Sequence, residues 1–96
     1  MTRNASFDDF LNLKEGAFRV FVFLLGDEYP SLNMENHWLF HNSLNVSIVR
    51  LNEDEFRMLD IARHPKIMVT NLGKELLQID GIPDPETFEK KLKELI

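Results

Sequence analysis

The segment that most constrains the fold is an apolar run at residues 18–25, with the sequence Phe-Arg-Val-Phe-Val-Phe-Leu-Leu. This run is too apolar for a strand with one face in water, and its content of Phe and Val is atypical of a helix. A strand of this composition is usually buried on both faces, as central strands are in sheets that are covered on both sides. We therefore expect a central strand in a layered α/β fold.

The segments around this run alternate between helix and strand signals. The expected elements are helices over residues 6–13, 31–43, 52–62 and 85–96, and strands over residues 18–25, 45–51, 67–70 and 75–79. Asp84 is expected to cap the last helix, since Pro85 at the first helical position is a strong start signal. Pro65 is expected to end the helix over 52–62, because a residue before proline is pushed out of the helical region.

This order of elements predicts one domain over residues 1–96. Strand–helix–strand units form parallel pairs through right-handed crossovers, and the last two strands form an antiparallel hairpin. The expected fold is an α/β sandwich in which helices cover both faces of a four-stranded mixed sheet.

Composition excludes several classes of function. The chain has 96 residues, no cysteine, and 11 basic against 16 acidic side chains, for a net charge of -5. Without cysteine there are no disulfides, thiol nucleophiles or thiolate metal sites. A nucleic-acid-binding surface is not expected, because it needs clustered Lys and Arg to neutralise phosphates.

Several segments resemble the thioredoxin-like fold family. Pro65 stands where thioredoxins carry a cis-proline before the first hairpin strand, residues 71–75 resemble their hairpin turn, and Gly81 fits the glycine that ends their last strand. Residues 7–10 and 20–24 resemble their first helix and central strand. The resemblance covers nearly the whole chain and implies a three-layer α/β/α sandwich with a cis bond before Pro65.

The active motif of that family, C-x-x-C, follows the central strand, and residues 28–31 of this chain, Glu-Tyr-Pro-Ser, stand in its place. Pro30 coincides with the proline of the common motif, whereas Glu28 and Ser31 replace the two cysteines. Thiol–disulfide exchange requires a thiolate that attacks a disulfide sulfur. The resemblance therefore implies a redox-inactive member that is not a thiol–disulfide oxidoreductase.

The resemblance also implies a binding face that survives the loss of sulfur. In thioredoxin-like proteins, the backbone beside the cis-proline pairs with an extended peptide through main-chain hydrogen bonds. We predict a noncatalytic binding, chaperone or assembly module that recognises a peptide or protein there and has no cofactor. The residues predicted to bind the partner are Glu28, Tyr29, Pro30, Ser31, His64 and Pro65.

Two enzymatic alternatives use residues of the same loops. Glu28 or Asp27 could pair with His64 and activate Ser31, which would assemble the parts of a hydrolase triad. No nucleophile-elbow pattern surrounds Ser31, so a hydrolase is a weaker hypothesis than a noncatalytic binding module.

A metal-dependent enzyme is the other alternative. His37 and His41 lie four residues apart on an expected helix and would share a face, and His64 could join them. Trp38 follows His37 where the zinc-protease motif has Glu, so we expect no metal site.

The remaining expectations concern location and partners. The longest apolar run, residues 20–25, is far below the roughly 20 residues that span a membrane. No basic start followed by an apolar run is present, so we expect a cytoplasmic protein without membrane contact. Exposed apolar residues could form a homodimer contact. The residues considered for it are Tyr29, Trp38, Phe40 and Leu44.

Overall fold

The apolar run is the central strand of the sheet. In a computed structural model of the chain, residues 3–28, 30 and 45–95 are described. The elements are β1 (Arg3–Ala5), α1 (Phe7–Leu13), β2 (Arg19–Leu25), β3 (Asn45–Leu51), α2 (Glu53–Met58), β4 (Lys66–Asn71), β5 (Lys74–Asp80) and α3 (Pro85–Lys93). The expected helix over 31–43 lies outside the described residues.

The sheet has five strands in the order β1-β3-β2-β4-β5. β2 and β3 run parallel with Val22 opposite Ile48, whereas β2 and β4 run antiparallel with Val22 opposite Ile67. The expected count of four strands is wrong, because β1 adds a parallel edge strand on β3. β1 spans only three residues and shows no alternation of apolar and polar residues, so its own sequence gives no strand signal. The strand is defined by its pairing with β3.

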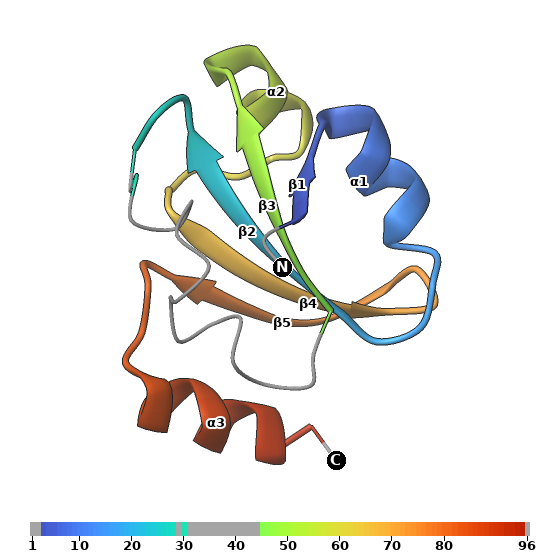
Figure 1. The fold of residues 1–96 in the computed structure, drawn as a ribbon, viewed down its shortest axis with the longest axis vertical. Coiled ribbons are helices and arrows are strands. Elements are labelled where there is room, and N and C mark those ends of the chain that lie inside the picture. Colours follow the sequence, from blue (N-terminus) through green and yellow to red (C-terminus); the bar gives the residue numbers. More distant parts are fainter. Residues whose placement is uncertain (1–2, 29, 31–44, 96) are drawn as a thin grey trace.

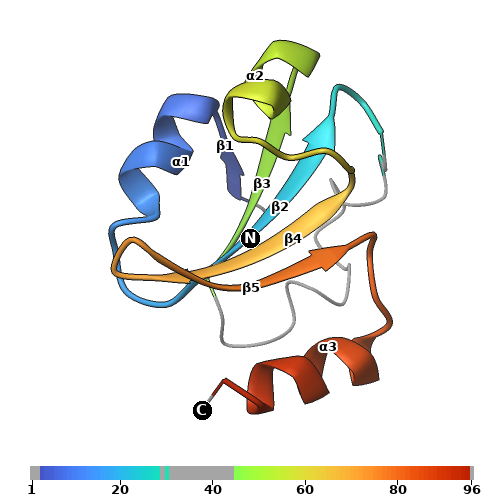
Figure 2. The same cartoon turned by 180° about the vertical axis from the view of Figure 1, so that it is seen from behind.

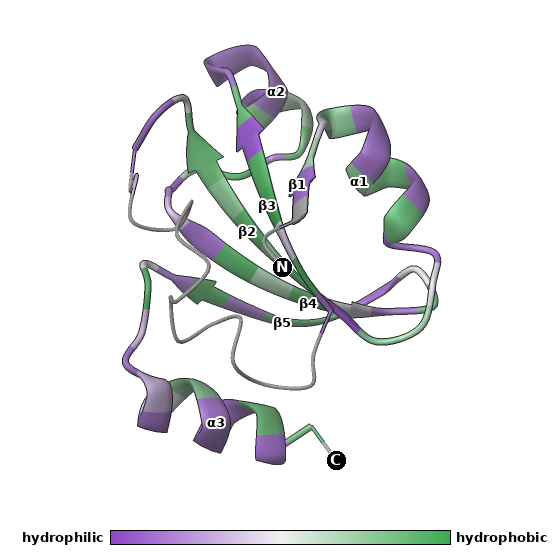
Figure 3. Cartoon of the chain, in the orientation of Figure 1, coloured by the Kyte–Doolittle hydropathy of each residue, from purple (hydrophilic) through white to green (hydrophobic). Residues whose placement is uncertain are grey.

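Helices cover both faces of the sheet, which confirms the expected sandwich. Figures 1 and 2 show α1 and α2 on one side of the sheet and α3 on the other. Val20, Val22 and Leu24 of β2 pack on the α3 side with Phe88. Phe21 and Phe23 face α1, where the Phe10 ring lies edge-on to them at centroid distances of 4.8 and 5.0 Å. Both faces of β2 are therefore apolar, and Figure 3 shows the strand green over most of its length.

Each described helix starts at a polar cap. Ser6 and Asn52 form capping boxes with Asp9 and Glu55, and Asp84 accepts a hydrogen bond from the Thr87 backbone N–H. These bonds satisfy N–H groups that have no partner within the helix.

The end of α2 differs from the expectation. The helix ends at Met58, and Asp60 adopts a left-handed backbone with φ 57°, while the Ile61 N–H bonds back to the Phe56 carbonyl. Pro65 is therefore not what stops it: a left-handed residue five positions earlier already turns the chain out of the helix. This early end releases residues 61–65 to form the approach to β4. None of the described helices is long and apolar enough to cross a lipid bilayer.

Candidate functional site

Two loops that are distant in sequence meet at one end of the sheet. Glu28 follows β2 and His64 precedes β4, and the His64 Nδ1 atom lies 2.9 Å from both carboxylate oxygens of Glu28. The His64 side chain is 37% exposed and the Glu28 side chain is 25% exposed, so the pair faces solvent at the edge of the molecule. The convergence follows from the pairing of β2 with β4, which brings the end of one strand beside the start of the other.

The loop after β2 is held in place by two further contacts. The Glu28 Oε1 atom accepts a hydrogen bond of 2.6 Å from the Leu25 backbone N–H. The Arg50 guanidinium, from the neighbouring strand β3, donates to the carbonyls of Gly26 and Glu28 at 2.8 Å each. The position of the Glu28 carboxylate is therefore determined by its own loop and by Arg50.

Arg50 was not among the residues predicted for this site. It interrupts the otherwise apolar end of β3, between Val49 and Leu51. A lone cation in an apolar strand is a signal that the sequence does contain, but only the pairing of β3 with β2 shows which carbonyls it reaches.

On the β4 side, the His64–Pro65 peptide bond is cis, as the resemblance implies. Pro65 is buried, and its carbonyl accepts a hydrogen bond from Gly81 at 2.7 Å. The His64 ring lies against Phe56 of α2 with a centroid distance of 5.3 Å. His64 is thus placed between α2 and Glu28.

A shallow pocket of about 370 Å³ opens beside His64. Its lining residues are Leu25, Glu53, Phe56, Arg57, Ile61, Ala62 and His64. Phe56 and Ile61 are buried and form an apolar floor, whereas Glu53 and Arg57 are exposed at the rim. The backbone groups of residues 62–64 form no hydrogen bond with other described residues, and this stretch of main chain borders an apolar pocket.

The other predicted site residues are only partly placed. Pro30 is exposed. Asp27 is exposed too, and it is Glu28 rather than Asp27 that contacts His64. Several residues considered for peptide binding, a triad, a metal site or a dimer lie outside the described residues. They are Tyr29, Ser31, His37, Trp38, Phe40, His41 and Leu44. Within the described ranges, no three His, Asp or Glu side chains gather as metal ligands.

This arrangement limits the chemistry of the described site. A carboxylate and an imidazole in contact can exchange protons or hold a polar group, and the adjoining pocket can take an apolar group. No thiol is available anywhere in the chain, so disulfide exchange by its own residues is excluded.

Comparison with known proteins gives similarity at the level of the fold. No family model and no curated protein sequence matches the chain. A designed protein superposes with a TM-score of 0.74 at 19% identity, over 98% of this chain and 96% of that one. Thioredoxin from Trypanosoma brucei brucei superposes with a TM-score of 0.68 at 16% identity, over 99% and 90% of the two chains. Thioredoxin from Fasciola hepatica gives 0.66 at 18% identity, over 96% and 98%.

Proposed function

We propose that this chain, a thioredoxin-like fold without cysteine, is a noncatalytic module that binds an extended segment of a peptide or protein partner. The observation that carries the proposal is the main chain of residues 62–64, which makes no hydrogen bond within the described part of the structure and lies beside the apolar pocket at His64. An extended peptide can pair with such a stretch through main-chain hydrogen bonds and place alternate side chains in adjoining pockets. A chaperone or assembly role would use this kind of recognition.

The pocket supports recognition of one apolar side chain. Its volume of about 370 Å³ lies at the lower end of the roughly 300–1,000 Å³ typical of ligand sites. Phe56 and Ile61 would contact the apolar group, and the exposed Glu53 and Arg57 would remain in water at the rim. Main-chain pairing would supply affinity, and the pocket would select the side chain.

The contacts that fix the neighbouring loop support a site that is formed before binding. Arg50 and Glu28 hold the loop after β2, and Glu28 contacts His64 on the other side. A site already ordered in the free protein loses less conformational entropy on binding than a flexible one.

NMR spectroscopy tests the proposal with a ¹⁵N-labelled chain and an extended peptide rich in apolar side chains. We expect saturable shifts at the amides of Gly26, Glu28 and residues 62–64. Ala62 is exposed at the pocket, so Ala62→Arg should block the site and weaken binding about tenfold or more. Ala17→Arg, also at an exposed alanine but in the loop after α1, is the matched control.

Saturable shifts confined to another surface, or equal affinity for both arginine variants, would contradict this site. The cytoplasmic location and the homodimer contact remain predictions, as does the participation of Tyr29, Pro30 and Ser31 in binding.

One observation favours a second candidate function, a hydrolase. His64 presents Nδ1 to the Glu28 carboxylate, which is the orientation that leaves Nε2 to act as a general base. We would then expect slow ester hydrolysis that is lost in both Ser31→Ala and Glu28→Gln. Hydrolysis unaffected by either substitution, or absent from the unmodified chain, would dismiss this alternative.

A further inference from the structure

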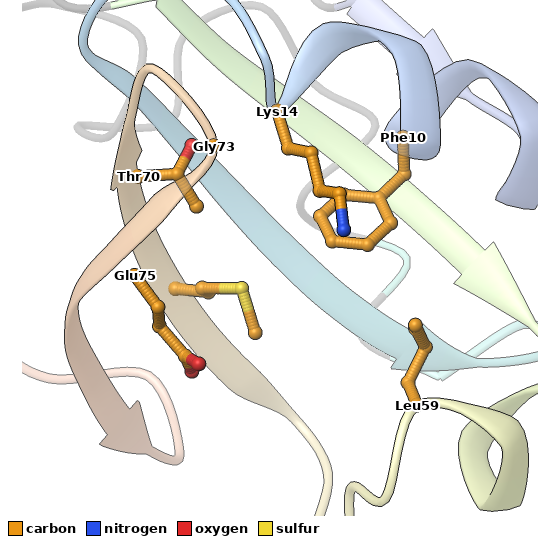
Figure 4. A pocket seen from close by; sticks show the side chains of 7 residues that line it. Phe10, Lys14, Leu59, Thr70, Gly73 and Glu75 are labelled. Carbon is orange, nitrogen blue, oxygen red and sulfur yellow. The ribbon is translucent and has the colours of Figure 1, made fainter.

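A second cavity, of about 170 Å³, opens between α1 and the β4–β5 hairpin. It is lined by Phe10, Lys14, Leu59, Met68, Thr70, Gly73 and Glu75. Figure 4 shows this cavity and labels each of these residues except Met68. Arg19 lies opposite Thr70 at one end of β2, whereas Glu28 follows the other end. The hairpin side of this cavity is therefore remote from the proposed peptide site and belongs to a different surface.

One wall of the cavity is apolar. Phe10 and Met68 are 3% and 8% exposed, and Leu59 is half-buried. The Phe10 ring is fixed by its edge-on packing against Phe21 and Phe23, so this wall is rigid. An aliphatic group that entered the cavity would lose contact with water against these three side chains.

Opposite charges reach the cavity from different elements. The Lys14 ammonium comes from the end of α1 and lies 5.8 Å from the centroid of the Phe10 ring, while Glu75 comes from β5. Figure 4 shows the Lys14 nitrogen and the Glu75 carboxylate on different walls. No ion pair within 4.0 Å joins either group to another described residue. Lys14 contacts the Phe10 ring, and within the described part of the chain neither Lys14 nor Glu75 has an ion-pair partner, so one cation and one anion flank an apolar wall.

The size of the cavity restricts the ligand. Its 170 Å³ is the space of about five or six liquid waters, at roughly 30 Å³ each. That is well below the roughly 300 Å³ at which sites for drug-sized ligands begin. The volume therefore limits the ligand to a small molecule. The apolar wall and the two flanking charges favour a molecule with an apolar body and two charged groups of opposite sign.

We propose that this cavity binds a free α-amino acid with an aliphatic side chain. The α-carboxylate would pair with Lys14, the α-ammonium would pair with Glu75, and the side chain would lie against Phe10, Leu59 and Met68. A zwitterion offers a charged partner to Lys14 and another to Glu75, whereas a simple carboxylate or a simple amine offers a partner to one of them. This binding is independent of the proposed peptide recognition.

The test uses NMR titration of the full chain with L-leucine as the probe. Two analogues of the same carbon skeleton separate the charges: 4-methylpentanoate lacks the ammonium, and isoamylamine lacks the carboxylate. We expect saturable shifts at Lys14, Leu59, Met68 and Gly73 with leucine, and binding by each analogue that is about tenfold weaker.

Variants identify the groups that bind. Lys14→Met and Glu75→Gln should each weaken leucine binding about tenfold, because each removes one charged partner. Lys90→Met and Glu86→Gln change exposed charges on α3 and should leave binding unaffected. Unfolding curves of all four variants show whether each one is folded.

Three outcomes would overturn the proposal. They are the absence of saturable shifts at millimolar leucine, equal binding of leucine and both analogues, and equal weakening by the α3 variants. Shifts at residues 62–64 alone would place leucine in the pocket beside His64 and would equally reject the cavity.

Discussion

Leu72 carries an unusual backbone for its side chain. Its φ is 52° and that of Gly73 is 81°, so both central residues of the β4–β5 turn are left-handed, as in a type I′ turn. The N–H groups of Leu72 and Gly73 donate to the carbonyls of Gly16 and Lys14 at 2.8 Å each. These bonds attach the turn to the loop after α1 and hold Leu72 in a conformation that costs a branched residue about 1 to 2 kcal/mol.

Leu72→Asn should raise the free energy of unfolding by about 1 kcal/mol, since Asn tolerates the left-handed region and Asn-Gly favours this turn. The leucine side chain is 69% exposed, so little burial is lost. Urea unfolding measures the change. A lower midpoint for Leu72→Asn than for the unmodified chain would show that the leucine side chain contributes to stability in a way that the turn geometry does not explain.

Thr70 is a buried polar residue whose hydroxyl has no partner among the described residues. It is 2% exposed, and its Oγ1 atom makes no hydrogen bond within the described ranges. Burying a hydroxyl without a hydrogen bond is unfavourable, and a methyl group of the same shape avoids that cost.

Thr70→Val should therefore increase the free energy of unfolding by about 1 kcal/mol. Lys74→Val, at an exposed position of β5, is the control and should change stability by less than about 0.5 kcal/mol. Denaturant titration compares the two variants. Destabilisation by Thr70→Val would mean that the native hydroxyl is hydrogen-bonded in solution.

At the scale of single elements, the helix caps connect stability to pH. Hydrogen bonds from the backbone N–H and then the hydroxyl of Ser6 hold the pKa of Asp9 below its ordinary value. Hydrogen bonds from Thr87, through its backbone and then its side chain, lower the pKa of Asp84 in the same way. In both cases the charged carboxylate is the form that the helix start stabilises.

The sign of the pH dependence follows. As the pH falls below the ordinary value of 3.8, the unfolded chain takes up protons at these positions before the folded chain does. The stabilisation is complete above that value and is lost as the pH falls through the lower folded pKa values.

The double substitution Asp9→Asn with Asp84→Asn should flatten the fall in stability below about pH 4. Urea unfolding between pH 2 and pH 6, run as about five titrations, measures the slope. Asp8→Asn removes a charge from the first turn of α1 without removing a cap, so it is the control. An unchanged slope in the double variant would show that these two caps do not cause the acid sensitivity.

At the scale of the whole molecule, one sheet joins two apolar layers. Phe88 packs with β2, β3 and β4 residues on one face, and Phe10 packs with β2 residues on the other. Because both layers share the same strands, loss of packing on one face should weaken the whole structure rather than one helix.

Phe88→Ala should lower the free energy of unfolding by about 3 to 5 kcal/mol, since this side chain is 2% exposed. Amide hydrogen exchange should become faster in α1 as well as in α3, because unfolding is cooperative across the sheet. Met58→Ala is the control, since its side chain is 72% exposed. Unchanged protection of α1 in Phe88→Ala would show that the two layers unfold separately.

The elements predicted correctly are those whose signals lie within a few residues. The apolar run is β2, the turn at Gly73 joins β4 to β5, and Asp84 caps α3. Apolar period, turn residues and caps act between neighbours in sequence, so a single chain displays them. The strand count was too low because β1 forms only through its pairing with β3. The end of α2 was placed too late because the left-handed backbone of Asp60 ends the helix before Pro65.

The burial of the central strand on both faces and the lack of thiol chemistry could both be predicted from the amino-acid sequence, because local apolarity and composition suffice for them. The folded structure was needed to show that Glu28 rather than Asp27 contacts His64, that Arg50 holds the loop after β2, and that Lys14 and Glu75 line a cavity. Glu28 and His64 are 36 residues apart, and the ladder between β2 and β4 brings them together. Such proximity depends on how strands pair and helices pack, which local signals do not specify.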